Sequence, residues 1–264
     1  MRDADENKSH FPSGIVIMRH GHREDSDNPL WQTKARFPFD TPLAAVENEI
    51  CAAARELKAA GRTFDVVYTS PFLRCLQTSE RLVRALGCER VPVFIHGGLA
   101  EVHNPRLLFK ASKPSFLQLA RYWLWRATYK RHSRPIRQRF AIKARILDSS
   151  CPQVPESEYH ATIRFRQIIM ELAARHPGQQ VLIVSHGKSV QVAQEALGCP
   201  ERICQVGFGG FIACRLKSEQ QEATQQERQQ DDKGAHQLAS AMQWMDFEID
   251  TKVPYFNVEF NAEG

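Results

Sequence analysis

Short apolar runs alternate along the chain with longer segments in which apolar residues recur at helical spacing. The runs at 15–18, 66–69, 91–95 and 181–184 are mostly apolar and have the length of buried strands. Apolar residues at helical spacing occupy the segments at 43–60, 72–86, 159–175 and 190–197. Strands separated by helices of this length predict an α/β fold with a mostly parallel central sheet and helices on both faces.

Glycine follows each of these predicted helices, at the position where a residue free to adopt positive φ closes a helix. The residues are Gly61, Gly87, Gly178 and Gly198. Their agreement with the periodicity supports the order of elements. Two further strands are predicted at 208–216 and 243–249.

Three segments depart from the alternating pattern. The stretch 104–155 is predicted to be a helical cap inserted into the domain, with helices at 116–127 and 136–147. Residues 1–12 and the Gln- and charge-rich stretch 217–236 lack apolar anchors, and we expect both to be disordered. Residues 13–264 then form a single domain.

Composition narrows the class of protein. The chain has 264 residues, of which 42% are apolar, enough for the core of one fairly large domain. Its formal charge of +5 is too small to indicate nucleic-acid binding but is compatible with an anionic substrate. Nine Lys or Arg and no Asp or Glu lie between Arg121 and Arg145. This basic segment has three possible explanations. It forms solvated helix faces, it caps an acidic ligand or, as the least favoured of the three, it contacts nucleic acid.

The N-terminal residues lack the apolar core of a signal peptide, and no stretch approaches the ~18 apolar residues that a membrane-spanning helix requires. We therefore expect a cytoplasmic protein that does not bind membranes. The seven cysteines include no Cys-x-x-Cys pair, which favours reduced, mostly buried thiols over disulfides or a zinc site.

A cluster suited to phosphoryl chemistry follows the first predicted strand. Arg19, His20, Gly21 and Arg23 come directly after the apolar run 15–18. Ligands of parallel sheets bind beyond the carboxyl ends of the strands, where these residues fall. A neutral His20 can attack phosphorus through one ring nitrogen if the other donates its proton to a backbone carbonyl. The guanidinium forks of Arg19 and Arg23 match phosphate oxygens.

Two other strands end in related residues. Arg74 belongs to a polar segment that follows the strand at 66–69 and opens a helix, and Ser185, His186 and Gly187 follow the strand at 181–184. A single histidine after a strand is commonly structural. Two strand-His-Gly junctions with an arginine at a third strand end indicate a shared site instead.

Three motifs stand in this order: Arg-His-Gly-x-Arg at 19–23, Ser-Pro-x-x-Arg-x-x-Gln-Thr at 70–78, and Ser-His-Gly at 185–187. Over about 15–216 the chain thereby resembles the histidine phosphatase superfamily, in its phosphoglycerate mutase-like branch. The resemblance implies a three-layer sandwich and hydrolysis of phosphomonoesters without metal or organic cofactor. It further implies that His20 becomes phosphorylated while Arg19, Arg74 and His186 complete the phosphate pocket.

The resemblance also suggests a proton donor. Glu101 follows Leu99 and Ala100 and is similar to the leucine-x-glutamate segment of the family. As a general acid it must hold a proton, so we expect desolvation and the phosphate dianion to raise its pKa. A surface glutamate is the alternative reading, and His103 is the alternative donor.

Substrate and partners are less closely defined by the sequence. Arg23 is similar to the pattern in phosphatases related to the suppressor-of-T-cell-signalling proteins, which implies a protein-tyrosine or broad-specificity phosphatase. The expected partner is a phosphorylated small molecule or a phosphoprotein, with a homodimer as a further option. The alternatives are a sugar-phosphate mutase or bisphosphatase, and a non-catalytic interaction module of the same fold.

Overall fold

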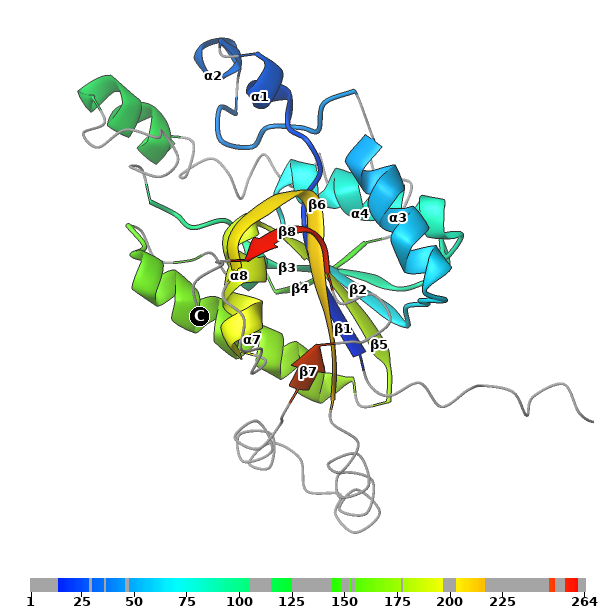
Figure 1. Cartoon of the computed structure of the whole chain (residues 1–264). Coiled ribbons are helices and arrows are strands. Elements are labelled where there is room, and N and C mark those ends of the chain that lie inside the picture. The colour runs from blue at the N-terminus through cyan, green and yellow to red at the C-terminus, as the bar shows by residue number, and fades with distance from the viewer. Residues whose placement is uncertain are drawn as a thin grey trace, which may run out of the picture.

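The computed structural model describes residues 14–28, 30–35, 37–45, 48–104, 115–124, 144–148, 152, 155–176, 178–196, 203–216, 247–249 and 255–260. The two segments predicted to be disordered, 1–12 and 217–236, lie outside these residues, as does most of the predicted cap. Within the described part of the chain, an eight-stranded sheet forms the centre of the molecule (Figure 1).

The sheet has the strand order β4-β3-β2-β5-β1-β6-β7, and β8 also pairs with β6. The pairs from β4 to β1 are parallel, whereas β6 is antiparallel to β1, β7 and β8. The prediction of a mostly parallel sheet is therefore confirmed. The strands are β1 (Gly14–Arg19), β2 (Val66–Thr69), β3 (Val93–His96), β4 (Arg145–Asp148), β5 (Gln180–Ser185), β6 (Ile203–Leu216), β7 (Phe247–Ile249) and β8 (Tyr255–Phe260).

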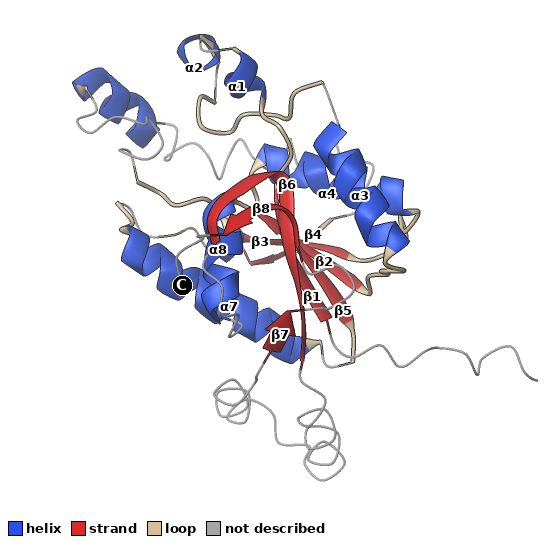
Figure 2. Cartoon of the chain, viewed as in Figure 1, coloured by secondary structure: helices blue, strands red, loops and turns tan. Residues whose placement is uncertain are grey.

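Helices cover both faces of the sheet (Figure 2). On one face lie α3 (Asn48–Ala59) and α4 (Leu73–Leu86), and on the other lie α7 (Glu158–Arg175) and α8 (Gly187–Ala196). The shorter elements are α1 (Glu24–Asp27), α2 (Trp31–Lys34), the 3₁₀ turn η1 (Gly97–Leu99) and a helix over residues 116–124. The predicted three-layer sandwich is confirmed.

The alternation of side chains along β1 explains why its whole apolar run is buried. Ile15 and Ile17 belong to the core beneath α7 and α8, whereas Val16 and Met18 belong to the core beneath α3 and α4. A parallel strand covered on both faces needs apolar residues at every position, which is the pattern of this sequence. The rigid strand then delivers the residues that follow it to a fixed edge of the sheet.

One predicted helix is wrong where the structure describes it. Residues 145–147 fall in the helix predicted at 136–147, yet Arg145–Asp148 form the edge strand β4, parallel to β3. Periodicity does not separate a helix from a strand in so short an apolar segment, and pairing with β3 decides the outcome.

Other predicted boundaries shift by a few residues. Helix α3 begins at Asn48 rather than at 43, because Leu43 forms a β-bridge with Arg23 and donates its N–H to Gln77. Helix α8 begins at Gly187, three residues before its prediction, and β6 begins at Ile203, five residues before its own. Strand β8 was not predicted.

Candidate active site

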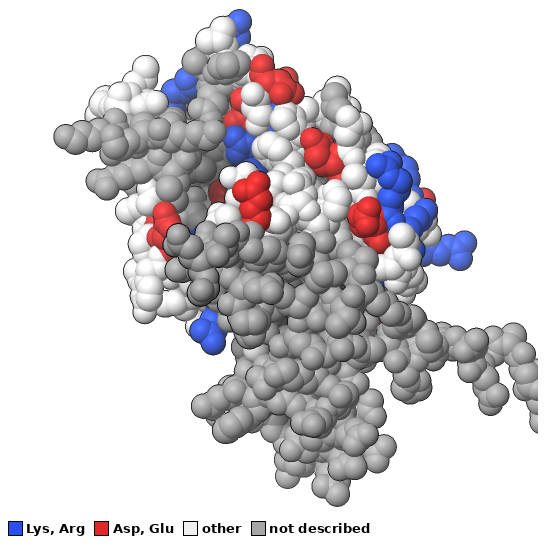
Figure 3. All heavy atoms as spheres, viewed as in Figure 1, with Lys and Arg blue, Asp and Glu red and all other residues white. Residues whose placement is uncertain are grey.

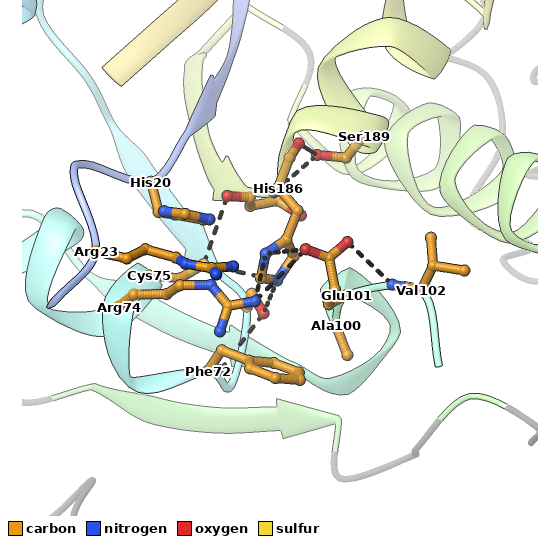
Figure 4. A network of polar contacts seen from close by, with 12 residues as sticks. His20, Arg23, Phe72, Arg74, Cys75, Ala100, Glu101, Val102, His186 and Ser189 are labelled. Carbon is orange, nitrogen blue, oxygen red and sulfur yellow. Dashed lines mark hydrogen bonds and ion pairs between the residues drawn. The ribbon is translucent and has the colours of Figure 1, made fainter. Parts of the chain in front are cut away.

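Polar residues from four parallel strands meet at the carboxyl edge of the sheet. His20 follows β1, Ser70 follows β2, Glu101 follows β3 and η1, and His186 follows β5. The sheet hydrogen bonding continues into this edge, since the N–H of His20 donates to Ser185 O at 3.0 Å. Figure 4 shows His20, Glu101 and His186 converging with Arg74 on one polar network. The structure thus brings together the three motifs that the sequence separates.

His20 has the geometry of a neutral nucleophile. Its ring is buried, and Nδ1 lies 2.8 Å from the carbonyl oxygen of Gly21, so a proton on Nδ1 leaves the Nε2 lone pair available. Burial, followed by the positive charge of Arg74, holds the pKa of His20 well below its usual range. A Cβ on Gly21 beside it would lie 2.7 Å from Ile50 Cδ1, so a larger residue there would require the buried Ile50 side chain to shift.

Arg74 projects into the centre of the network from the first turn of α4. Its side chain is buried, its guanidinium lies 4.5 Å from the centre of the Phe72 ring, and Nη1 donates to Phe39 O at 3.3 Å. Nη2 lies 3.2 Å from His186 Nδ1. Its Nε has no hydrogen-bond partner among the described residues. A buried guanidinium whose Nε–H has no partner among the described residues is suited to binding an anionic ligand.

His186 is held between a hydroxyl and a carboxylate. Ser70 Oγ accepts the N–H of Phe72 and lies 3.0 Å from His186 Nε2, an arrangement in which the hydroxyl donates to that nitrogen. Nδ1 lies 3.2 Å from Glu101 Oε2. Burial, together with Arg74, lowers the pKa of His186 to about 4 against the opposing effect of Glu101. The imidazole is therefore a neutral donor near pH 7.

The carboxyl of Glu101 has a lowered pKa, whereas the expected rise depends also on a phosphate dianion beside it. Burial by itself raises the pKa of Glu101, but His186 and Arg74 outweigh burial and hold it well below the usual range. Arg74 Nη2 lies 3.5 Å from Oε2, and Oε1 accepts the N–H of Val102 at 3.1 Å. The Glu101 side chain is 23% exposed and lines a cavity.

The two arginines of the first motif have different surroundings. The guanidinium of Arg19 lies 4.2 Å from the centre of the Phe208 ring, its Nη1 donates to Val206 O, and its Nε has no hydrogen-bond partner among the described residues. Burial lowers the pKa of Arg19 to about 10, which leaves it cationic. Arg23 binds Asp25 through two bonds of 2.8 and 2.6 Å, so its fork is already engaged.

Arg19, His20 and Glu101 line a polar cavity of about 310 Å³, and Arg74 and His186 lie behind them in the network. Of the described residues that line it, three are cations and one is a carboxylate, which makes this lining electropositive. On the face of the molecule shown in Figure 3, the described charges of both signs are intermixed instead. The lining residues are Arg19, His20, Arg23, Glu101, Gly187, Lys188, Gln191, Cys204, Gln205 and Val206. Among the described residues, no group of three or more His, Cys, Asp or Glu is placed to hold a metal ion.

Phe208 is a site residue that the sequence reasoning missed. Its ring lies 5.8 Å from the His20 ring and covers Arg19. It sits where the register of β6 with β8 shifts, and Gly209, at φ 68°, donates its N–H to His20 O at 3.1 Å. The Gly-Phe-Gly-Gly sequence at 207–210 was the available signal, because glycines inside a strand mark bulges.

A buried ion pair anchors the segment that carries Glu101. Arg164 of α7 binds Glu156 through two bonds of 2.7 Å and also donates to the carbonyl oxygens of Gly98 and Ala100. Glu156 accepts the N–H of His103 at 3.3 Å. The pair therefore holds the backbone on both sides of Glu101. We call it the Glu156–Arg164 clamp.

His103, the alternative proton donor, lies away from the cavity. Its ring is buried 6.0 Å from the Phe72 ring, and it is not among the residues that line the cavity. Glu101 is therefore the better placed of the two candidates.

A neutral histidine beside buried arginine forks at the carboxyl edge of an α/β sheet is an arrangement suited to an oxyanion. The family model of the histidine phosphatase superfamily, branch 1, matches residues 15–205. The chain belongs to this superfamily.

Two solved structures show the same fold. A mycobacterial glucosyl-3-phosphoglycerate phosphatase complexed with VO₃ is 16% identical, with a TM-score of 0.51 over 89% of this chain and 96% of that chain. An ecdysone phosphate phosphatase from Bombix mori in complex with tungstate is 16% identical, with a TM-score of 0.50 over 79% of this chain and 90% of that chain. At these identities the likeness concerns the fold alone. Among the described residues no helix is long and apolar enough to cross a membrane.

Proposed function

We propose that the protein hydrolyses phosphomonoesters through a phosphohistidine formed on His20. The observation that carries this proposal is the buried, neutral imidazole, whose Nδ1 is bound to Gly21 O at 2.8 Å and which lines an electropositive cavity. A nitrogen nucleophile must be unprotonated to attack. The positive charges of Arg74 and Arg19, which add to the effect of burial in lowering the pKa of His20, also attract the phosphate dianion.

In the first step the phosphoryl group passes from the ester oxygen to Nε2 of His20. Charge on the non-bridging oxygens is stabilised by the forks of Arg19 and Arg74 and by the N–H of His186. The Nε donors of the two arginines, which have no partner among the described residues, are available for this. In the second step, water attacks phosphorus and releases phosphate and neutral His20.

Glu101 supplies the proton to the leaving oxygen in this scheme. The carboxyl is ionised in the free protein because Arg74 and His186 stabilise its charge. A bound phosphate dianion competes for those same donors and adds its own negative charge, and both effects raise the pKa of Glu101. Substrate binding therefore favours the protonated form of Glu101, which is the form that can act as the acid. The same carboxylate then serves as base for the water.

The neighbouring structures support hydrolysis of a phosphate ester. Both are named as phosphatases, and their titles record tungstate and VO₃, oxyanions that resemble phosphate. A mutase remains the second candidate within the superfamily. It would move phosphate between positions of a substrate and release little inorganic phosphate.

The test measures phosphate release from p-nitrophenyl phosphate, with chelator present, by wild type and His20→Ala. We expect the variant to lose turnover and to keep its fold. His160→Ala is the matched control and should be fully active, because His160 is exposed, contacts Ser157 and Tyr159, and is not among the residues that line the cavity. Equal turnover by wild type and His20→Ala would overturn the proposal.

A further inference from the structure

The two arginines that flank His20 in the sequence are held in place by different kinds of group. Asp25 binds Arg23 through two hydrogen bonds, so an anionic ligand has to displace a carboxylate to use that fork. The guanidinium of Arg19 lies instead over the ring of Phe208, 4.2 Å from its centre. Because a π face attracts a cation without accepting any of its N–H donors in a carboxylate-like pair, this contact leaves the fork of Arg19 available.

Other contacts narrow the positions that Arg19 can adopt. A Cβ added to Gly187, the first residue of α8, would lie 3.5 Å from Arg19 Cδ, so the backbone there borders the arginine side chain. Nη1 of Arg19 donates to Val206 O. Its Nε has no hydrogen-bond partner among the described residues. The side chain is therefore restrained while a donor stays open to an anion.

The ring of Phe208 offsets electrostatic repulsion at this place. Burial, opposed by Glu101, lowers the pKa of Arg19, and the positive charges of Arg23 and Arg74 lower it further. Like charges at this edge favour conformations in which Arg19 points away from the site. A neutral ring that attracts the guanidinium counters this tendency and leaves the positive charge available to a ligand.

Phe208 is itself held by two neighbouring strands. Asn257 of β8 donates from Nδ2 to Phe208 O at 2.8 Å, and the N–H of Gly209 donates to His20 O at 3.1 Å. The ring lies 5.8 Å from the His20 ring and 4.8 Å from the His22 ring. These contacts fix the half-buried ring against the segment that carries the first motif.

We propose that Phe208 is a positioning residue for Arg19, holding its guanidinium toward the phosphate without occupying the fork. This inference rests on the proposed role of Arg19 in binding the phosphoryl group. Without the ring, more of the ordering of Arg19 must accompany ligand binding. Ordering one long side chain on binding lowers affinity by about three- to tenfold.

The first test measures the binding of tungstate, an oxyanion that resembles phosphate, by calorimetry. We expect Phe208→Leu to weaken binding by about three- to tenfold and to lower kcat/KM for p-nitrophenyl phosphate by a similar factor. Phe94→Leu is the matched control and should bind tungstate as wild type does, because this half-buried ring of β3 stacks on Tyr68 and is not among the residues that line the cavity.

A double-mutant cycle shows whether the ring acts through Arg19. In the background of Arg19→Met, Phe208→Leu should cause no further loss of tungstate affinity. If Phe208→Leu weakens binding by the same factor with and without Arg19, the ring acts on the fold or on His20, and the proposal is overturned.

A second test keeps the shape of the side chain. Phenylalanine analogues with one, two or three ring fluorines at position 208 progressively weaken the negative charge of the ring face. Tungstate affinity should fall stepwise along this series, and a constant affinity would overturn the proposal even if Phe208→Leu did not fold. If tungstate binding shows this dependence while wild type hydrolyses no ester, the proposed function fails and the role of Phe208 stands.

Discussion

Breaking the Glu156–Arg164 clamp should destabilise the protein and disturb the acid step together. Arg164→Leu removes a side chain that is 14% exposed and leaves the 4% exposed carboxylate of Glu156 without its cation. Removing one partner of a buried pair costs about 3–5 kcal/mol. Since each kcal/mol lowers the Tm of domains near this size by roughly 2–4 °C, we expect a fall of about 6 °C or more.

The same substitution should act on catalysis through Glu101. Arg164 also donates to the carbonyl oxygens of Gly98 and Ala100, so its loss frees the backbone just before Glu101. We expect a larger loss of kcat with alkyl phosphates, which need a well-placed acid, than with p-nitrophenyl phosphate. Arg164 is thus predicted to be a positioning residue, and the difference between the two esters separates this role from general destabilisation.

Thermal unfolding and the two-ester assay check this prediction against a matched control. Arg175 also pairs with a glutamate, Glu171, but both side chains are well exposed, so Arg175→Leu should change the free energy of unfolding by about 0.5 kcal/mol or less. If the two variants lose the same Tm, or if Arg164→Leu slows both esters equally, the reasoning about the clamp is refuted.

Three further predictions concern the central residues. Arg74→Ala should lower kcat/KM by about 10² or more, with partial rescue by lysine, which supplies charge without the fork; full activity in a steady-state assay of Arg74→Ala would contradict this. Glu101→Gln should slow alkyl phosphates more than p-nitrophenyl phosphate, and equal losses would argue against its role as the acid. In urea unfolding, stability should fall between pH 6.5 and about 4, because the unfolded chain binds a proton there that native His186, with its lowered pKa, excludes. Unchanged stability across this range would contradict the burial of a neutral His186.

Much of the site could be predicted because it depends on local sequence patterns. A strand buried on both faces reads as a short apolar run, and parallel strands end at one edge, so His20, Arg74 and His186 had to lie near one another. The same logic puts Glu101 at this edge, and the structure brings it within 3.5 Å of Arg74 and His186. Its low pKa without phosphate could not be predicted, since the pKa depends on distances to Arg74 and His186 that no spacing reveals.

Other features depend on contacts between distant segments. The Glu156–Arg164 clamp holds the backbone next to Glu101, about sixty residues earlier in the chain, and no local pattern predicts this contact. Phe208 reaches His20 only because β6 lies antiparallel to β1. The edge strand β4 was predicted to be a helix for a related reason, since pairing with β3 rather than local spacing determines its conformation.

Trapping the covalent intermediate tests the central claim most directly. Brief incubation of wild type with a ³²P-labelled phosphate ester, followed by quenching in base, should yield labelled protein whose label is stable to base, labile to acid and located on His20. His20→Ala should take up no label. Burial raises the pKa of the Cys75 thiol to about 12, so label on this neighbouring residue is not expected. Label on serine, cysteine or aspartate, or undiminished labelling of His20→Ala, would contradict a phosphohistidine mechanism.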